Sequence, residues 1–202
     1  MVKTVFKTQQ KSNNPKVYFT SDPHFGHDNL NAKLRKLTTE DADALIIKNW
    51  NKTVLYANDK VYIVGDLTME KHNFIEKYVS QLNGEIIVIG GNHDNRKCCK
   101  KLQELGITVM GCLEYKGYIV THIPVRYEQA KEFRGNIHGH IHSYEIPSYR
   151  YINVSCDMNN FTPLDLDDIL RKQSKKKSIT SIVKLTLLFF KDKLKNMTFF
   201  KK

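Results

Sequence analysis

Side chains that can bind metal ions occur in five short clusters, and most of these clusters directly follow a run of apolar residues. In chain order the positions are Asp22 and His24 after VYFTS, Asp66 after VYIVG, Asn92 and His93 after IIVIGG, His122 after YIVT, and then His140 and His142. Imidazole nitrogens combined with carboxylate and amide oxygens, without thiolates, suit Mn, Fe, Zn, Co or Ni better than a structural zinc finger. The pattern therefore predicts a divalent metal centre.

The apolar runs that precede these clusters have the length and composition of buried strands. They span residues 17–21, 61–65, 86–90, 118–121 and 151–155, and each is rich in β-branched or aromatic residues. Helical spacing of apolar residues predicts helices over 41–50 and 70–82, and a short helix over 97–105 that ends at Gly106. Alternating strands and helices indicate an α/β fold, in which the carboxyl ends of the strands meet along one edge and bring the clusters together.

The second half of the chain is expected to be richer in strands than the first. We expect these strands to be mainly antiparallel, with a hairpin turn at Lys116-Gly117. A closing helix is predicted over residues 164–172, because Pro163 precedes an acidic first turn and basic residues end the last turn.

The clusters, taken in order, resemble the motifs of the calcineurin-like metallophosphoesterases. These motifs are D-x-H at 22–24, G-D at 65–66, G-N-H-D at 91–94, the lone His122, and G-H-x-H at 139–142. The segments FTSDPHFGHDN and NVSCDMNNFTPLDLDDIL resemble the small, stand-alone bacterial and phage branch of that family, and the resemblance covers residues 16–171. Each motif is common by chance, but five in order at strand ends are specific. The resemblance implies a sandwich of two mixed β-sheets flanked by helices.

The resemblance also implies how the ligands divide between two metal ions. Asp22, His24 and His142 would hold one ion, Asn92, His122 and His140 the other, and Asp66 would bridge them. Two cations about 3.5–4 Å apart clamp the oxygens of a phosphate and activate a water molecule. We expect Mn first, with Fe, Zn, Co or Ni as alternatives. Each ligand alone could instead be a satisfied polar group of the core, but the joint arrangement favours a metal centre.

Two further residues would serve catalysis directly according to the same resemblance. His93 would protonate or orient the leaving oxygen, and Asp94 would hold the ring of His93. Three weaker candidates for phosphate contact are His27, Arg96 and Arg126, each of which has a solvated surface residue as its alternative interpretation. The remaining histidines and two motif glycines are interpreted as structural: His72, His138, Gly91 and Gly139.

The predicted activity is hydrolysis of a phosphate ester by direct attack of metal-bound hydroxide, without a covalent phosphoenzyme. We expect a phosphodiester of a small nucleotide or of a nucleic-acid end. The alternatives are a phosphomonoesterase or protein phosphatase, and a non-catalytic scaffold with the same fold.

The charge of the chain is concentrated at one end. Of the 32 Lys and Arg residues, 11 lie between residues 171 and 202 beside the single acid Asp192, which leaves 21 basic and 20 acidic residues before them. A nearly neutral catalytic domain argues against an extended nucleic-acid groove. With 202 residues and 41% hydrophobic content, we expect a polar lead-in at 1–15, one domain at 16–172 and a basic tail at 173–202.

The basic tail mixes lysines with bulky apolar residues. Such a segment can contact an anionic membrane surface or nucleic acid; alternatively it is a poorly ordered extension or an extra helix packed on the domain. We favour a poorly ordered extension or an extra helix packed on the domain, since the resemblance ends before the tail. The absence of a signal peptide and of about 18 consecutive apolar residues predicts a cytoplasmic protein. The four cysteines are interpreted as reduced thiols: Cys98, Cys99, Cys112 and Cys156.

Overall fold

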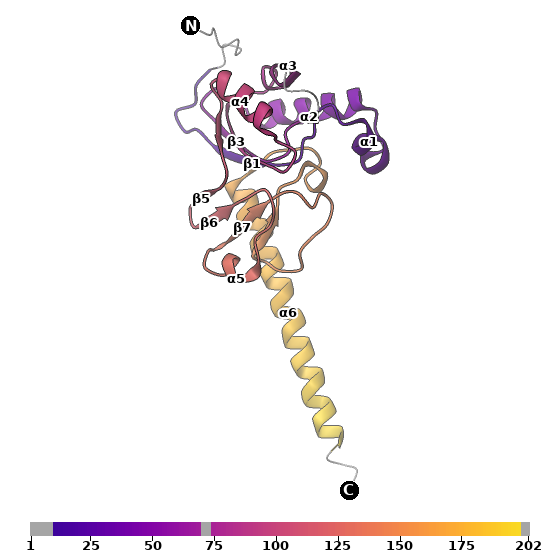
Figure 1. Ribbon diagram of the computed structural model, residues 1–202. Coiled ribbons are helices and arrows are strands. Elements are labelled where there is room, and N and C mark those ends of the chain that lie inside the picture. Colours follow the sequence, from indigo (N-terminus) through magenta and orange to yellow (C-terminus); the bar gives the residue numbers. More distant parts are fainter. Residues whose placement is uncertain (1–9, 70–73, 199–202) are drawn as a thin grey trace.

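The computed structural model describes residues 10–69 and 74–198 of the chain. A five-stranded sheet packs against a four-stranded sheet, and helices cover the outer face of the larger sheet (Figure 1). The predicted α/β sandwich of two mixed sheets is therefore confirmed.

The larger sheet has the order β4-β3-β2-β1-β9. Strands β1 (Val17–Thr20), β2 (Lys60–Val64), β3 (Glu85–Ile89) and β4 (Thr108–Met110) are parallel, and the edge strand β9 (Leu164–Asp165) is antiparallel to β1. The three predicted strands in this half are confirmed, whereas the short β4 and β9 were not predicted. The carboxyl ends of β1, β2 and β3 lie at one edge, where their loops can share a site.

The smaller sheet contains β5 (Leu113–Tyr115), β6 (Tyr118–Val120), β7 (Gly135–His138) and β8 (Tyr151–Asn153) in that order. The expectation of mainly antiparallel strands is wrong, because β6–β7 and β7–β8 are parallel pairs. The long connections that follow β6 and β7 return the chain to the starting end of the sheet. Only β5 and β6 form the predicted hairpin, where Lys116 (φ 49°) and Gly117 (φ 82°) form its turn.

Helices α2 (Thr39–Thr53), α3 (Ile75–Val79) and α4 (Arg96–Glu104) cover the larger sheet, as predicted. The Thr38 hydroxyl accepts the N–H of Asp41 at the start of α2, and the Asn95 side chain caps α4. Helix α3 is shorter than the predicted 70–82, and residues 70–73, including His72, lie outside the described residues.

Four short helical turns were not predicted. They are α1 (Asp28–Leu30), the π-helix η1 (Asn31–Arg35), α5 (Tyr127–Ala130) and the 3₁₀-helix η3 (Cys156–Met158). The wide turn of η1 ends at Lys36 in the left-handed conformation (φ 59°) and directs the long side chain of Arg35 into the interior.

Apolar side chains of the central strands alternate between two cores. On β2, Val61 and Ile63 pack under the helices, while Tyr62 and Val64 face the smaller sheet. Trp50 of α2 is 1% exposed within the helix-side core. Burial on both faces explains why these strands read as uninterrupted apolar runs in the sequence.

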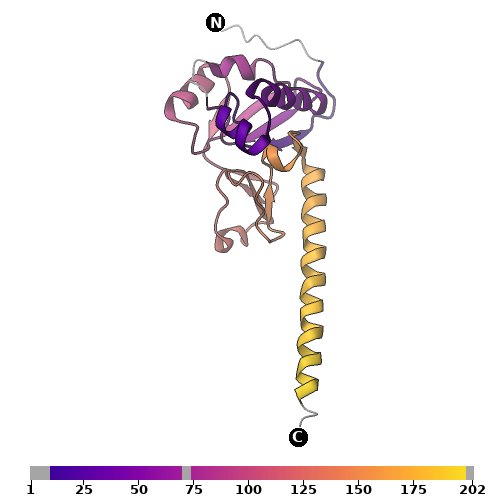
Figure 2. The same cartoon turned by 90° about the vertical axis from the view of Figure 1, so that its right-hand side faces the viewer.

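Helix α6 (Leu166–Thr198) differs from the predicted closing helix over 164–172. It begins two residues later because Leu164 pairs with Phe19 in β9, and it continues through the basic tail without a break at residue 172. Its first turns contact β1, β8 and β9, and the remainder extends well beyond both sheets (Figure 2). None of the helices in the described parts of the chain has an apolar stretch long enough to cross a membrane.

Asn136 provides a test of the smaller sheet. Its fully buried amide donates to the carbonyl oxygens of Ile119 and Ile137 and accepts the N–H of Val125. Asn136→Asp replaces this donor by an acceptor, so the free energy of unfolding should fall by about 1–3 kcal/mol in urea denaturation at neutral pH. The exposed control Asn29→Asp should change it by less than about 0.5 kcal/mol. Equal losses in both variants would contradict the assigned role.

Candidate metal centre

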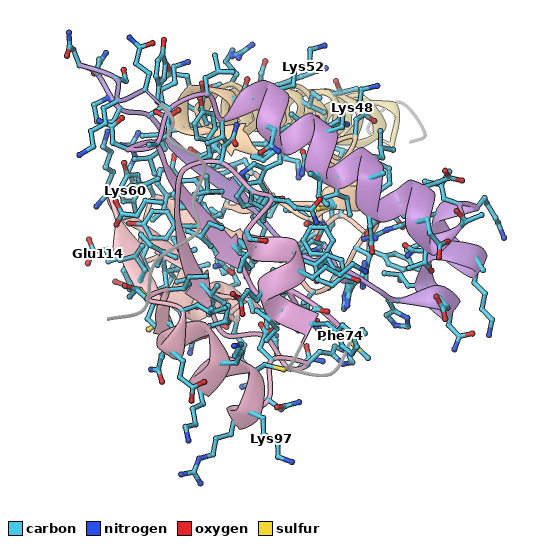
Figure 3. All side chains as sticks on the ribbon, turned by 90° about the horizontal axis from the view of Figure 1, so that it is seen from above. Lys48, Lys52, Lys60, Phe74, Lys97 and Glu114 are labelled. Atoms are coloured by element: carbon cyan, nitrogen blue, oxygen red, sulfur yellow. The ribbon has the colours of Figure 1, made fainter. Side chains whose placement is uncertain are left out.

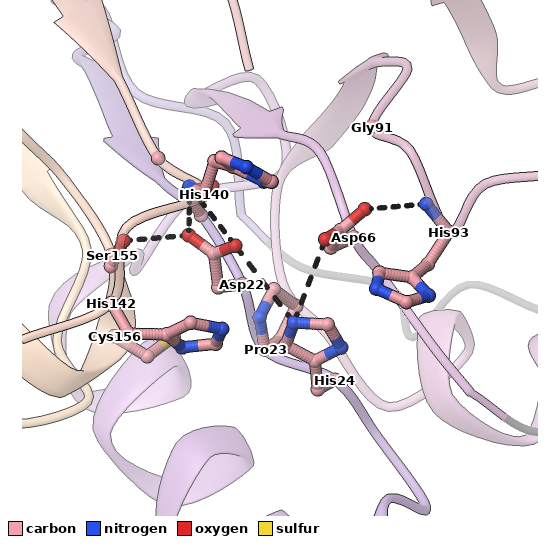
Figure 4. A network of polar contacts seen from close by, with 12 residues as sticks. Asp22, Pro23, His24, Asp66, Gly91, His93, His140, His142, Ser155 and Cys156 are labelled. Carbon is pink, nitrogen blue, oxygen red and sulfur yellow. Dashed lines mark hydrogen bonds and ion pairs between the residues drawn. The ribbon is translucent and has the colours of Figure 1, made fainter. Parts of the chain in front are cut away.

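Two groups of side chains meet where the loops after β1, β2 and β3 face the loops of the smaller sheet (Figure 4). In each group the ligand atoms lie within 4.8 Å of one another, and the groups are Asp22, His24 and His142, and Asp66, His122 and His140. The side-chain oxygen of Asn92 lies 3.0 Å from Nε2 of His122 and joins the second group. The structure thus brings all seven predicted ligands together.

Asp66 stands between the two groups. Its Oδ2 is 3.2 Å from Nε2 of His122 and 3.6 Å from Nε2 of His24. Its Oδ1 accepts the backbone N–H of His93 at 2.9 Å, which orients the carboxylate. Although burial raises the pKa of Asp66, hydrogen bonding to His122 and the N–H of His93 lowers it overall, so the carboxylate is ionised and can serve both groups.

His24 has the neutral form that metal binding requires. Both ring nitrogens of His24 are buried and have no hydrogen-bond partner, which is costly unless a cation takes up a lone pair. Burial lowers the pKa of His24 to about 3, so the ring is neutral. Nδ1 of His122 donates to the carbonyl oxygen of Val64 at 2.8 Å, which directs Nε2 toward the side-chain oxygens of Asn92 and Asp66. The residues present therefore fit a divalent cation in each group.

The backbone adopts a sparsely populated conformation at most of these residues. Asp22, His24, Asp66, His140 and His142 all have positive φ, between 47° and 70°. A non-glycine residue in this region costs of order 1–3 kcal/mol, and such strain collects at functional sites. The left-handed residues turn the chain sharply at the strand ends, so their side chains converge.

Three motif glycines provide the room for these side chains. A Cβ atom at Gly65 would overlap the ring of His122, one at Gly91 would overlap the carboxylate of Asp66, and one at Gly139 would overlap Asp22. Gly91 and Gly139 were interpreted as structural, and neither has positive φ. The restriction at these two positions arises from the close approach of Asp66 and Asp22.

A buried ion pair that the sequence analysis missed supports the first group. Asp157 accepts a 2.7 Å hydrogen bond from Nδ1 of His142, and this bond raises the pKa of His142. The other oxygen of Asp157 accepts Nε–H of Arg35 at 2.8 Å, and Arg35 also donates to the backbone carbonyl groups of Asp22 and Pro23. The Arg35 side chain is 1% exposed. Arg35 and Asp157 therefore fix the orientation of the first group.

The carboxylate of Asp22 is held from the opposite side. Ser155 donates its hydroxyl hydrogen to Oδ2 of Asp22 at 2.6 Å, and the N–H of His140 donates to both carboxylate oxygens. Figure 4 shows these contacts beside the ring of His24. Asp22 is fully buried, so its position depends on these donors.

Asp94 has a different role from the predicted one. It was expected to hold the ring of His93, but its carboxylate accepts the backbone N–H groups of Asp66, Leu67 and Gly91 at 2.8–3.0 Å. This expectation is wrong because the loop after β3 turns the buried side chain back under the loop after β2. Asp94 therefore positions Asp66 rather than the ring of His93.

His93 and His27 lie at the open side of the centre. The exposed His93 has its ring centroid 5.5 Å from that of His24, and the half-buried His27 is 5.6 Å from His24 on another side. Burial and the nearby His93 lower the pKa of His27, whose Nδ1 caps α1 by accepting the N–H of Leu30. Both rings can face a substrate bound at the two groups.

The positions of Arg96 and Arg126 do not support their predicted contact with phosphate. Arg96 starts α4 and Arg126 precedes α5; both are exposed, and no hydrogen bond or ion pair joins either to the two groups among the described residues. Their predicted contact with phosphate stays a prediction. His138, predicted to be structural, is fully buried and bonds through Nδ1 to the carbonyl oxygen of Gly139.

Comparison with known proteins agrees with this geometry. Residues 15–187 match the model of the calcineurin-like phosphoesterases. An uncharacterized protein of Methanocaldococcus jannaschii is 33% identical over 181 residues, which cover 83% of this chain and 96% of the relative. A protein of unknown function from Aquifex aeolicus has a similar structure, with a TM-score of 0.61, 26% identity, and coverage of 78% of this chain and 99% of that one.

The chain therefore belongs to the calcineurin-like phosphoesterase family. The family depends on two metal ions, and the structure holds two groups that can bind them. The chain is accordingly a metal-dependent phosphoester hydrolase.

Arg35 tests whether the buried ion pair supports metal binding. Arg35→Lys keeps the charge but loses the forked donors that join Asp157 to the carbonyl groups of Asp22 and Pro23. We expect the affinity for Mn to fall about 10–100-fold in isothermal titration calorimetry. The control is Arg171→Lys, whose side chain is 77% exposed, and it should leave the affinity unchanged. Wild-type affinity in Arg35→Lys would exclude the proposed support.

Asp94 and His93 can be separated by measuring metal binding and hydrolysis in the same variants. Asp94→Asn removes one of the acceptors that hold the loop of Asp66, so both Mn affinity and hydrolysis should fall. His93→Ala should lower hydrolysis about 100-fold or more while Mn affinity stays the same. If Asp94→Asn instead reproduces the pattern of His93→Ala, its main role is to orient the ring.

Proposed function

We propose that this hydrolase cleaves a phosphodiester of a small nucleotide or of a nucleic-acid end. The observation that carries the proposal is the position of Asp66 between two groups of ligands, with the exposed His93 at their open side. A pair of groups joined by a carboxylate suits an in-line displacement at phosphorus. We propose Mn as the resident metal and the seven predicted ligands as its binding residues.

The roles of the chain's own residues follow from their positions. Asp22, His24 and His142 would hold one cation, and Asn92, His122 and His140 the other, with Asp66 between them. The two cations would offset phosphate charge and lower the pKa of a water molecule. His93 would donate a proton to the leaving oxygen. The motif residues include no serine, cysteine or threonine placed as a nucleophile, which favours direct attack by water.

Among the described residues, no guanidinium group in contact with the two groups is available to a substrate, and this supports a diester rather than a monoester. The one guanidinium in contact with the two groups, among the described residues, is that of Arg35. Four of its five N–H groups donate to Asp157, Asn31, Pro23 and Asp22, so it is not available to a substrate. A diester carries one negative charge and a monoester up to two, and the diester therefore needs fewer cationic side chains.

We further propose that the activity belongs to the cytoplasm. All four cysteines are free thiols, and two of them, Cys98 and Cys156, are buried. Unpaired cysteines are typical of a reducing compartment.

The test compares the hydrolysis of two generic substrates by metal-stripped protein supplied again with Mn. We expect bis-p-nitrophenyl phosphate to be cleaved faster than p-nitrophenyl phosphate. Asp66→Ala should abolish the activity, and His93→Ala should lower kcat about 100-fold. The control Asp167→Ala removes an exposed carboxylate from the first turn of α6 and should retain full activity.

The outcomes separate the alternative functions. Faster hydrolysis of the monoester would replace the diester proposal by a phosphomonoesterase or protein phosphatase. If the protein binds two Mn ions per chain but cleaves neither these substrates nor a panel of nucleotide diesters, the family fold serves here as a non-catalytic scaffold.

A further inference from the structure

Helix α6 leaves the domain after its first turns. Those turns contact β1, β8 and β9, whereas the following turns stand clear of both sheets (Figures 1 and 2). A helix of 33 residues that is packed at one end only has a long surface available to a partner.

An apolar line runs along the projecting part of α6. Ile179 and Val183 are each 52% exposed and Leu187 is 57% exposed, and steps of four residues place all three on one side of the helix. Ile179 and Val183 also line a hollow of about 350 Å³ together with Ile146 and Pro147 of the loop before β8. The apolar line is therefore continuous with the edge of the domain.

Lysines lie beside the start of this apolar line. Lys172, Lys175 and Lys176 line an adjoining hollow of about 270 Å³. Among the described ion pairs, only Lys176 of these three meets a carboxylate, that of Glu145 at 2.6 Å. Between residues 171 and 198 the sequence has nine Lys and Arg residues and the single acid Asp192. Helix α6 thus combines a sequence rich in basic residues with exposed aliphatic side chains.

We propose that this surface of α6 binds an anionic lipid bilayer. The line of Ile179, Val183 and Leu187 enters the boundary between headgroups and acyl chains, and the exposed Lys175 and Lys177 contact lipid phosphates. The helix lies on the bilayer, in agreement with the absence of a membrane-crossing segment among the described helices. This binding is independent of the proposed hydrolysis and would hold the catalytic domain at the membrane surface.

Two other possible partners fit this surface of α6 less well than a lipid bilayer does. A second copy of the chain would bring two strongly positive helices together, and like charges oppose that pairing. A nucleic acid would neutralise the lysines but leave the aliphatic line in water, because nucleic-acid surfaces are read through charge and aromatic stacking. A lipid surface satisfies both features at once.

The experiment is co-sedimentation of the full metal-loaded chain with lipid vesicles. One set contains phosphatidylcholine alone, and the other includes about 30% phosphatidylserine to give a negative surface potential. The apolar variant is Ile179→Ser/Val183→Ser/Leu187→Ser, and its matched control is Leu55→Ser, which replaces a side chain that is also 57% exposed. Circular dichroism verifies that each variant is folded.

A second pair of variants tests the charge. Lys175→Gln/Lys177→Gln removes two exposed lysines of α6, and the control Lys48→Gln/Lys52→Gln removes two exposed lysines that point outward from α2 (Figure 3). Each lysine near an anionic surface is worth about 1 kcal/mol, so two substitutions should lower the partition coefficient about 25-fold. The apolar variant should lower it at least about tenfold, and both controls should stay within about twofold of the wild type.

Binding to the anionic vesicles only, lost in both α6 variants, supports the proposal. Equal binding to neutral vesicles, or no binding to either set, overturns it. Tight binding of an oligonucleotide that the apolar variant retains, without vesicle binding, would identify nucleic acid as the partner instead. A dimer in sedimentation velocity that the apolar variant abolishes, again without vesicle binding, would identify a second copy.

Discussion

The structure depends on one carboxylate that must serve two groups of ligands at once. Asp66 can do so because its two carboxylate oxygens and its backbone N–H each contact a defined partner. Oδ2 faces His24 and His122, Oδ1 accepts the N–H of His93, and the N–H of Asp66 donates to Asp94. If the side chain of Asp66 could rotate freely, its carboxylate would not remain between the two groups. The loops after β2 and β3 are therefore joined by hydrogen bonds from backbone N–H groups to the carboxylates of Asp66 and Asp94.

The same constraint explains why strain is tolerated at the centre. Five of the seven ligands lie in the left-handed region, which isolated residues of these types rarely adopt. The strands that lead into these turns are buried on both faces, and the two cores hold them in place. The packing of the sandwich thus offsets the free-energy cost of the local backbone conformations that bring the predicted ligands together.

The second support of the centre is the buried ion pair of Arg35 and Asp157. It joins the π-helical turn before α2 to the turn after β8, and through His142 it reaches the loop after β7. A buried pair is costly to desolvate unless its remaining donors and acceptors are satisfied. Here Arg35 uses further donors in hydrogen bonds to the carbonyl groups of Asp22 and Pro23. The pair therefore fixes the positions of the side chains in the first group, in addition to any contribution to stability.

The sequence by itself determined the ligand types, the strands that precede them and the capped helices. These features are local: a strand buried on both faces reads as an apolar run, and Thr38 and Asn95 are helix caps within the helices' own sequence. The parallel pairing of the smaller sheet and the role of Asp94 could not be read in this way. They depend on where the chain returns after a loop, and Arg35 and Asp157 are 122 positions apart. Only tertiary packing decides such pairs, because no short-range pattern links residues that meet only after the sheets have assembled.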